Sequence, residues 1–252
     1  MKPETNPTDA MITCDRLTHR FHDGSVGICE VDLSVSEGEL VIFAGANGSG
    51  KSTLLRHFNG LLLPTAGEVR IAGKPVREDL RWVRQFVAMV FQDPESQIVG
   101  ETVWADAAFG PENLGFSGEK IRQRVQEALD AVGLTAKADQ RPHTLSGGEK
   151  RRLAVAGILT TNPSVVMFDE PFSGLDYPGV CQVMEQIRRL RAQGRTLLVS
   201  THELAPVLPL ADRLVVLDAG RIVRNAAPVD SLQDLESLGV RTPCPACFGR
   251  DG

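Results

Sequence analysis

Short hydrophobic segments of strand length alternate with polar turns and amphipathic segments along most of the chain. Over 28–44, apolar Val31, Leu33 and Val35 alternate with polar residues, and a Glu-Gly turn leads into the run Leu-Val-Ile-Phe, which predicts strands. Further strands are expected at 68–71, 86–91, 164–168 and 196–200. Strands that alternate with helices pair in parallel through right-handed crossovers, so the pattern indicates an α/β fold with a mostly parallel core sheet.

Helical spacing dominates between about residues 95 and 158. Over 118–132, apolar Ile121, Val125 and Leu129 recur on one face of a helix that carries charged residues on its other face. Further helices are expected at 51–58, 150–159 and 180–193. Because the block interrupts the series of strands, the sequence predicts a helical lobe inserted into one continuous domain.

Length and charge limit the class of protein. The 252 residues, 42% hydrophobic and 23% charged, are typical of a globular chain that forms one large or two-lobed domain. Lys and Arg number 27 and Asp and Glu number 32, which gives a net charge of −5. Because nucleic-acid binding usually requires a basic face, no nucleic-acid partner is expected.

Cysteine usage and hydropathy limit the compartment. The five cysteines are an odd number scattered along the chain, which fits a reducing compartment better than a disulfide framework. Cys244 and Cys247 have C-x-x-C spacing without a second pair nearby, so a tail with reduced thiols is favoured over a zinc site. Residues 1–10 contain no secretory signal, and no apolar run is long enough to span a bilayer. Another chain is therefore expected to bring the protein to any membrane at which it works.

A glycine-rich loop follows the apolar strand. Residues 45–52, Gly-Ala-Asn-Gly-Ser-Gly-Lys-Ser, match the P-loop pattern G-x-x-x-x-G-K-[ST] between a predicted strand and a predicted helix. Small residues let backbone N–H groups turn toward an anion, and the helix N-terminus adds its positive end. Lys51 supplies a cation for the terminal phosphates, and the Ser52 hydroxyl supplies a ligand for Mg²⁺. The nucleotide contacts expected here are Gly45, Ala46, Asn47, Gly48, Ser49, Gly50, Lys51, Ser52 and Thr53.

Two carboxylates end the apolar strand at 165–168. A buried strand that delivers Asp169 to a Mg²⁺–nucleotide site would complete the machinery of the P-loop. Glu170 is expected to polarise a water, because it lies at the same strand end beside the metal. A surface acidic pair is the alternative interpretation, which the P-loop in the same chain disfavours.

A second anion-binding pattern precedes the helix at 150–159. The sequence Leu-Ser-Gly-Gly-Glu at 145–149 begins a helix with small residues, which exposes free N–H groups and the positive end of the helix dipole. This segment resembles the signature motif of the ABC ATPases, and other motifs follow in that family's order over roughly residues 11–238. The resemblance implies that ATP binds between two chains, against Ser146, Gly147, Gly148 and Glu149 of the second chain.

The resemblance assigns roles to further positions. Gln92 resembles the glutamine that links the metal to the helical lobe, and His202 resembles the switch histidine that contacts the γ-phosphate. Asp176 belongs to a segment similar to the D-loop, and Phe21 is placed to stack on adenine, with simple packing as its alternative. The implied catalytic residues are Glu170, His202 and Gln92, and the implied ligands of Mg²⁺ are Ser52, Gln92 and Asp169.

A finer likeness follows Gln92. The segments 91–98, 102–103 and 109–115 look like those of energy-coupling-factor and cobalt/nickel-type importer ATPases. This resemblance implies a peripheral ATPase at the cytoplasmic face of the cell membrane, which pairs with an identical or paralogous cassette. It would dock on a membrane transporter subunit and use ATP hydrolysis to power uptake of a vitamin or a transition-metal ion. Residues 93–114 would form the docking surface, with Ile98 and Val99 as the positions to test.

Two other classes of protein are alternatives to a transporter ATPase. A soluble ABC ATPase acting on nucleic acid or ribosomes usually carries a coiled-coil insertion or a second cassette. A P-loop small-molecule kinase would leave the segment at 145–149 without a purpose. By resemblance we expect a P-loop NTPase of the ABC type, with a mostly parallel core sheet, an N-terminal antiparallel β region and an inserted α-helical subdomain. The expected divisions are a flexible leader at 1–10, the ATPase domain at 11–238 with its helical subdomain at about 95–158, and an irregular tail at 239–252.

Overall fold

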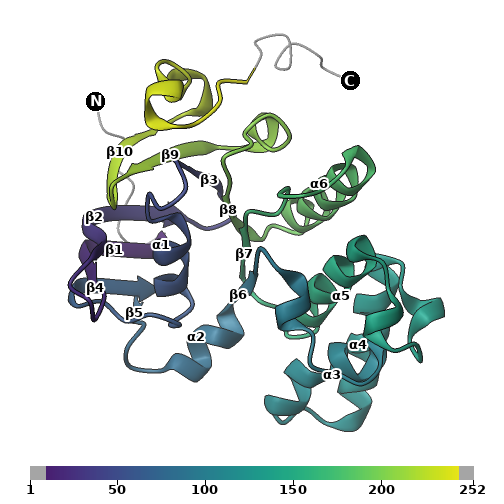
Figure 1. Ribbon diagram of the computed structural model, residues 1–252. Coiled ribbons are helices and arrows are strands. Elements are labelled where there is room, and N and C mark those ends of the chain that lie inside the picture. Colours follow the sequence, from purple (N-terminus) through teal and green to yellow (C-terminus); the bar gives the residue numbers. More distant parts are fainter. Residues whose placement is uncertain (1–9, 244–252) are drawn as a thin grey trace.

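The strands form two separate sheets in the computed structural model, which describes residues 10–243 (Figure 1). The first sheet is antiparallel and four-stranded, in the order β2-β1-β4-β5. Its strands are β1 (Ala10–Arg20), β2 (Val26–Ser36), β4 (Ala66–Ile71) and β5 (Lys74–Pro75). Strand β1 was not among the strands expected from the sequence, and it begins at the last residue of the expected leader.

The second sheet is six-stranded, in the order β10-β9-β3-β8-β7-β6. Its strands are β3 (Leu40–Ala44), β6 (Val87–Val90), β7 (Val165–Asp169), β8 (Thr196–Ser200), β9 (Arg213–Asp218) and β10 (Arg221–Ala226). All neighbours pair in parallel except β9 and β10, so the expectation of a mostly parallel core sheet is confirmed. The register places Asp169, at the end of β7, opposite Ser200, at the end of β8.

Six α-helices are described, and α3, α4 and α5 pack on one another at one end of the core sheet (Figure 1). They are α1 (Lys51–Phe58), α2 (Leu80–Phe86), α3 (Val103–Asn113), α4 (Gly118–Val132), α5 (Gly147–Leu159) and α6 (Tyr177–Ala192). Short 3₁₀ turns are η1 (Pro94–Gln97), η2 (Thr135–Lys137), η3 (Pro142–Thr144), η4 (Leu208–Leu210), η5 (Pro228–Ser231) and η6 (Leu235–Leu238). The helical group is inserted between β6 and β7, as expected. Phe86 ends α2, so the strand expected at 86–91 begins one residue later.

The core sheet is buried on both faces because each face is covered by other elements. On one face, Val41 and Phe43 of β3 join a cluster with α1 and the antiparallel sheet. On the other face, Leu40 and Ile42 join a cluster with α6 and the helical group. Alternate residues of one strand therefore serve two cores, which explains why the strand is apolar throughout.

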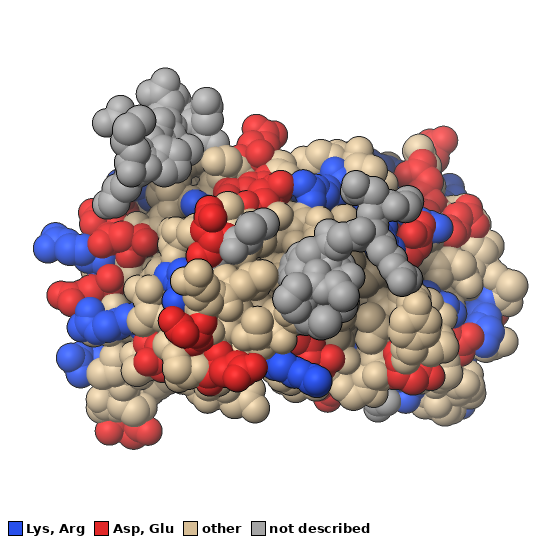
Figure 2. Space-filling view, turned by 90° about the horizontal axis from the view of Figure 1, so that it is seen from above, with Lys and Arg blue, Asp and Glu red and all other residues tan. Residues whose placement is uncertain are grey.

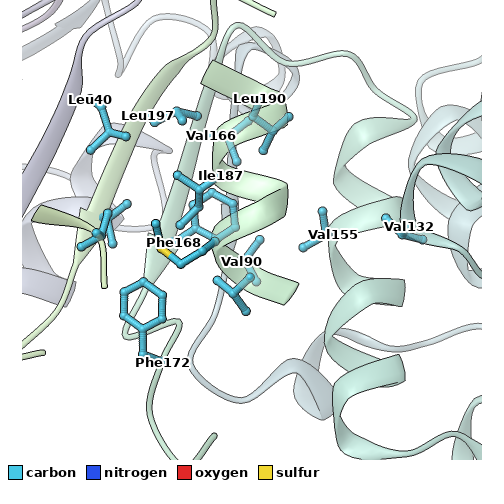
Figure 3. Packing of buried hydrophobic residues seen from close by; sticks show 14 of the residues in the cluster. Leu40, Val90, Val132, Val155, Val166, Phe168, Phe172, Ile187, Leu190 and Leu197 are labelled. Carbon is cyan, nitrogen blue, oxygen red and sulfur yellow. The ribbon is translucent and has the colours of Figure 1, made fainter. Parts of the chain in front are cut away.

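Figure 3 shows how the second cluster extends between sheet and helices. Phe168 of β7 lies beside Ile187 of α6, and Val155 of α5 lies beside Val132 of α4. A single hydrophobic cluster thus connects the core sheet with the helical group. The helices are consequently tied to the sheet by apolar packing as well as by the chain.

The surface is mixed in charge on the face that Figure 2 shows. Acidic and basic side chains are interspersed there over the described part of the chain.

Within residues 10–243, none of the helices has both the length and the apolar character needed to cross a membrane. Residues 1–9 of the expected leader, and Cys244 and Cys247 of the expected tail, lie outside the described residues.

Candidate active site

The glycine-rich loop connects β3 to α1 and takes a shape that glycine allows. Gly45 has φ 149°, and a Cβ there would lie 2.3 Å from the carbonyl oxygen of Leu217. Gly50 has φ 106°, and a Cβ there would lie 2.8 Å from the carbonyl oxygen of Gly27. Gly50 also precedes α1 without a side-chain cap, so the first N–H groups of the helix remain available to an anion.

Lys51 lies in the first turn of α1 and is only 5% exposed. Its Nζ donates to the carbonyl oxygens of Gly45, at 2.8 Å, and Ala46, at 3.1 Å. The same nitrogen lies 3.4 Å from Oε1 of Glu170. A buried ammonium needs such partners to offset the cost of desolvation. The loop therefore holds a cation at the place where the motif predicts the terminal phosphates.

Asp169 lies at the centre of a hydroxyl cluster at the ends of β7 and β8. Ser52 Oγ donates to Asp169 Oδ1 at 2.9 Å, and Ser200 Oγ donates to the same oxygen at 2.5 Å. The carboxylate is almost fully buried, at 4% exposed. The structure thus brings together Ser52 and Asp169, two of the three expected magnesium ligands, while Ser200 was missed by sequence reasoning.

Glu170 is held by both its backbone and its carboxylate. Its φ is 47°, which is unfavourable for a residue with a Cβ, and its N–H donates to the carbonyl oxygen of Ser200 at 2.9 Å. Oε2 accepts hydrogen bonds from Nδ1 of His202, at 2.8 Å, and from the His202 backbone N–H, at 3.3 Å. Oε1 is buried and has no hydrogen-bond donor among residues 10–243. One carboxylate oxygen is therefore fixed by His202, and the other, 3.4 Å from Lys51 Nζ, can accept a hydrogen bond.

Phe21 lies at the edge of the same region and is 41% exposed. Its ring packs at right angles to that of His19, with 4.8 Å between centroids. A Cβ on Gly27 would lie 2.7 Å from the Phe21 ring, so the glycine lets the ring lie against the β2 backbone. His19 Nδ1 lies 3.1 Å from Nε2 of His57, which is fully buried on α1. Sequence reasoning did not identify this histidine pair, because neither residue belongs to a motif.

A cavity of about 640 Å³ opens over these groups. The expected site residues that line it are Phe21, Asn47, Gly48, Gly50, Lys51, Ser52, Thr53, Gln92, Glu170 and His202. Gly45, Ala46, Ser49 and Asp169 do not line it, but the first two bind Lys51 and the last binds Ser52. The structure thus gathers residues of the loop and of the segments that follow β1, β6, β7 and β8 around one space.

The segment at 145–149 does not line this cavity. Ser146 caps α5: its Oγ accepts from the Glu149 N–H at 3.3 Å, and the Glu149 carboxylate accepts from the Ser146 N–H at 3.0 Å. Lys137 Nζ donates to Glu149 at 2.6 Å, and these hydrogen bonds lower the pKa of Glu149 to about 2. Ser146 and Gly147 are exposed, as a surface for a second molecule would be. The Glu149 carboxylate is engaged within its own chain.

Asp176 also lies away from the cavity, at the start of α6. Its Oδ1 accepts a hydrogen bond from the Gly179 N–H at 3.0 Å, so Asp176 is the N-cap of α6. Among residues 10–243, no three His, Cys, Asp or Glu side chains come together as a metal site. The expected ligands of Mg²⁺ are instead one hydroxyl, one amide and one carboxylate. Such a set can suffice for a nucleotide-bound Mg²⁺, because phosphate oxygens supply the remaining ligands of the ion.

The parallel sheet, the glycine-rich loop before α1 and the acidic end of β7 define a P-loop ATPase. A family model described as ABC transporter matches residues 28–173, more than half of the chain, and the chain belongs to this family. It resembles the energy-coupling factor transporter ATP-binding protein EcfA of Methanocaldococcus jannaschii, with 44% identity over 225 residues, 88% of this chain and 81% of that protein. The predicted resemblance is confirmed.

Solved structures share the fold. One is CbiO1 from Clostridium perfringens, part of the ABC transporter complex cbiONQ, with a TM-score of 0.82, 32% identity and coverage of 91% of this chain and 93% of that one. Another is the dimeric ATP-binding cassette MJ0796 in a post-hydrolysis state bound to ADP and Pi. Its TM-score is 0.78, with 28% identity and coverage of 86% and 99%. The predicted fold class is confirmed, and the kinase alternative is not supported.

Proposed function

We propose that this chain binds Mg-ATP in the cavity beside Lys51, hydrolyses it to ADP and phosphate, and powers a membrane importer of the energy-coupling-factor type. The observation that carries the proposal is the Glu170 carboxylate, which is fixed through Oε2 while Oε1 has no donor among the described residues. Such an oxygen is suited to accept a hydrogen bond from a water molecule.

The phosphates of ATP fit the loop by charge and by geometry. The free N–H groups at the start of α1 and the buried Lys51 ammonium would offset the charge of the phosphates. Phe21 would stack on the base at the other end of the cavity, since its half-exposed ring lines that space. The distribution of these groups matches a ligand with an aromatic end and an anionic end.

The donor set around Asp169 fits Mg²⁺. A hydroxyl and a carboxylate already lie 2.9 Å apart between Ser52 and Asp169, and Gln92 lines the same cavity. Oxygen donors of this kind, together with phosphate oxygens and water, are what Mg²⁺ prefers. When bound, the ion would neutralise charge on the β- and γ-phosphates.

Hydrolysis would depend on positioning and electrostatics. Glu170 would accept a hydrogen bond from the attacking water through Oε1, while His202 keeps the carboxylate in place. His202 lines the cavity, so it can also approach the γ-phosphate. Phosphoryl transfer passes through a loose transition state, in which the protein contributes mainly by orienting the water and offsetting charge.

A second cassette would complete the site. The exposed N-terminus of α5, with Ser146 and Gly147, presents N–H groups away from the chain's own cavity. The dimeric structure of the related cassette MJ0796 supports a pair of chains. We propose that Ser146–Glu149 of one chain faces the phosphates held by the other, and that Asp176 lies in the same interface. Glu149 would act there by holding the helix cap.

The membrane subunit would dock beside the helical group. A groove of about 300 Å³ lies between β6, α3 and α5, and Val99 and Phe109 on its rim are 60% and 51% exposed. Exposed apolar side chains beside a groove are suited to an apolar segment of a partner. Ile98, the other position singled out from the sequence, packs against the hydrophobic cluster instead. A substitution at Val99 therefore tests docking with less disturbance of the core than one at Ile98.

The related EcfA and CbiO1, an energy-coupling factor transporter ATP-binding protein and a part of an ABC transporter complex, support a transporter as the partner. We propose that this transporter is an importer whose cargo is a vitamin or a transition-metal ion. In this proposal the chain acts at the cytoplasmic face of the membrane, without a nucleic-acid partner. We also propose that the chain has two lobes, a catalytic body and a helical subdomain at about 95–158.

Purification of the tagged chain from detergent-solubilised membranes tests the function. We expect integral membrane proteins to co-purify, and we expect the complex to hydrolyse ATP in a Mg²⁺-dependent reaction. Co-purification of RNA or ribosomal proteins with no membrane protein would support the soluble alternative. A complex without ATPase activity would contradict the proposed reaction.

A further inference from the structure

The turn that follows η6 lies directly against the phosphate loop. Gly239 has φ 72°, and a Cβ at that position would lie 2.8 Å from the Cβ of Ala46. Two carbons normally approach no closer than about 3.5 Å. The Cα and N atoms of Ala46 would be 3.5 and 3.8 Å away, so the methyl group of Ala46 is the single close obstacle. The chain near its C-terminal end thus meets the loop at a point that has room for glycine alone.

Two buried side chains fix this turn in place. Leu235 is 0% exposed and Val240 is 1% exposed, and both belong to the hydrophobic cluster of the core sheet. The Val240 N–H donates to the carbonyl oxygen of Leu235 at 3.0 Å, and the Gly239 N–H donates to that of Glu236 at 3.1 Å. With an anchor on either side, the turn cannot move away from Ala46 without disturbing the core.

Ala46 is connected to the phosphate-binding groups. Its carbonyl oxygen accepts hydrogen bonds from the Ser49 N–H and from Lys51 Nζ, both at 3.1 Å. The β9–β10 turn supports the loop at a second point, because the Gly220 N–H donates to the carbonyl oxygen of Ser49 at 3.0 Å. Any displacement of Ala46 would therefore change the position of the lysine that is to meet the phosphates.

We propose that Gly239 is a positioning residue for the phosphate loop: the turn over Leu235–Val240 holds Ala46, and through it Lys51, in the geometry that binds nucleotide phosphates. The inference rests on the proposed function of the loop and deepens it. It gives the segment after β10 a part in ATP binding, although the segment does not line the cavity.

The test compares Gly239→Ala with Gly73→Ala. Gly73 has a similar φ of 78°, but a Cβ there would meet nothing within 4 Å, so this variant reports backbone strain alone. Both variants are titrated with ATP, and their thermal midpoints are measured. We expect the Kd for ATP to rise at least about fivefold in Gly239→Ala relative to Gly73→Ala, since coupling between contacting residues commonly has this size.

A second-site variant separates the contact from general damage. Ala46→Gly removes the methyl group that Gly239→Ala would strike, so the double variant should bind ATP within about twofold of Ala46→Gly alone. Equal affinities in Gly239→Ala and Gly73→Ala would overturn the inference, and so would a double variant as weak as Gly239→Ala. If the wild-type chain and Lys51→Ala bind ATP equally, the loop is not a phosphate site and the proposed function itself fails.

Discussion

Nδ1 of His202 and Oε2 of Glu170 lie 2.8 Å apart, and this hydrogen bond fixes one oxygen of a carboxylate whose other oxygen has no donor within residues 10–243. The two residues follow neighbouring parallel strands, so the sheet itself brings them together. Lys51 Nζ lies 3.4 Å from Oε1 and forms an ion pair with the carboxylate. His202 and the backbone thus orient one carboxylate oxygen, and we propose that the other, Oε1, accepts a hydrogen bond from the attacking water.

Glu170→Gln should slow ATP hydrolysis while preserving ATP binding. The amide keeps the shape of the side chain but is a poor base, so turnover should fall by roughly 10²-fold or more. Steady-state phosphate release and a separate ATP titration measure the two properties. Glu203→Gln is the matched control, because that carboxylate is half exposed and only approaches Nε2 of His202, at 4.0 Å. Normal turnover in Glu170→Gln would assign the catalytic role to another group.

Lys51→Ala should weaken ATP binding. The change removes the buried ammonium and leaves Glu170 without its ion-pair partner, so two negative groups would face each other when phosphate enters. We expect the Kd for ATP to rise at least about tenfold, and isothermal titration measures it directly. Lys74→Ala, an exposed lysine on β5, should leave the Kd unchanged. An unchanged Kd in Lys51→Ala would contradict the phosphate-site assignment.

The sequence predicted β3, β7 and β8 because these strands are buried on both faces, although β9, which is equally buried over 214–217, was not among the expected strands. β3, β7 and β8 contain only buried residues, and such strands appear as continuous apolar runs. β1 was missed because its register shifts between Cys14 and Leu17, near Arg16 with φ 43°, which breaks the alternation. β10 was missed because it is half exposed and contains several polar residues.

The candidate site was predicted where a motif names its residues. The loop was predicted from its context between strand and helix, and Asp169 and Glu170 were predicted from their place at the end of an apolar strand in a chain with a P-loop. Ser200 was missed because a serine that ends a buried strand has no signature of its own, although its neighbour in the sheet is Asp169. The contact between Gly239 and Ala46 could not be predicted, because it depends on how two segments far apart in the sequence pack in space.

The buried histidine pair predicts a pH-dependent stability. Burial lowers the pKa of His57 to about 4 from its ordinary value of 6.5. Nδ1 of His57 lies 2.7 Å from the carbonyl oxygen of Thr53, and Nε2 lies 3.1 Å from Nδ1 of His19, so a protonated, charged His57 would be held away from water and beside a second imidazole. The unfolded chain binds this proton more readily, so the free energy of unfolding should fall as the pH drops from about 6.5 to about 4.

The size of this effect is up to about 3 kcal/mol, since one pKa unit corresponds to about 1.4 kcal/mol. Urea unfolding at several pH values measures it. The decline between pH 6.5 and pH 4 should be smaller in His57→Leu than in the wild type. The exposed His143 provides the control, and His143→Gln should keep the wild-type slope. Equal slopes in the wild type and His57→Leu would show that other groups cause the acid sensitivity.

Val99→Asp should release the chain from its membrane partner without loss of ATP binding. Val99 is 60% exposed at the rim of the groove beside α3, so a carboxylate there costs the fold little but would be buried unpaired against an apolar partner. The loop itself stays in place because the N–H groups of Val99 and Gly100 donate to Asp106 Oδ1 at 2.8 and 3.0 Å. Val223→Asp is the matched control, since that valine is 49% exposed on β10, in the opposite part of the core sheet. Co-sedimentation with membranes that contain the transporter subunit should fall at least about tenfold for Val99→Asp and stay unchanged for Val223→Asp. If both variants remain bound, the docking surface lies outside this groove.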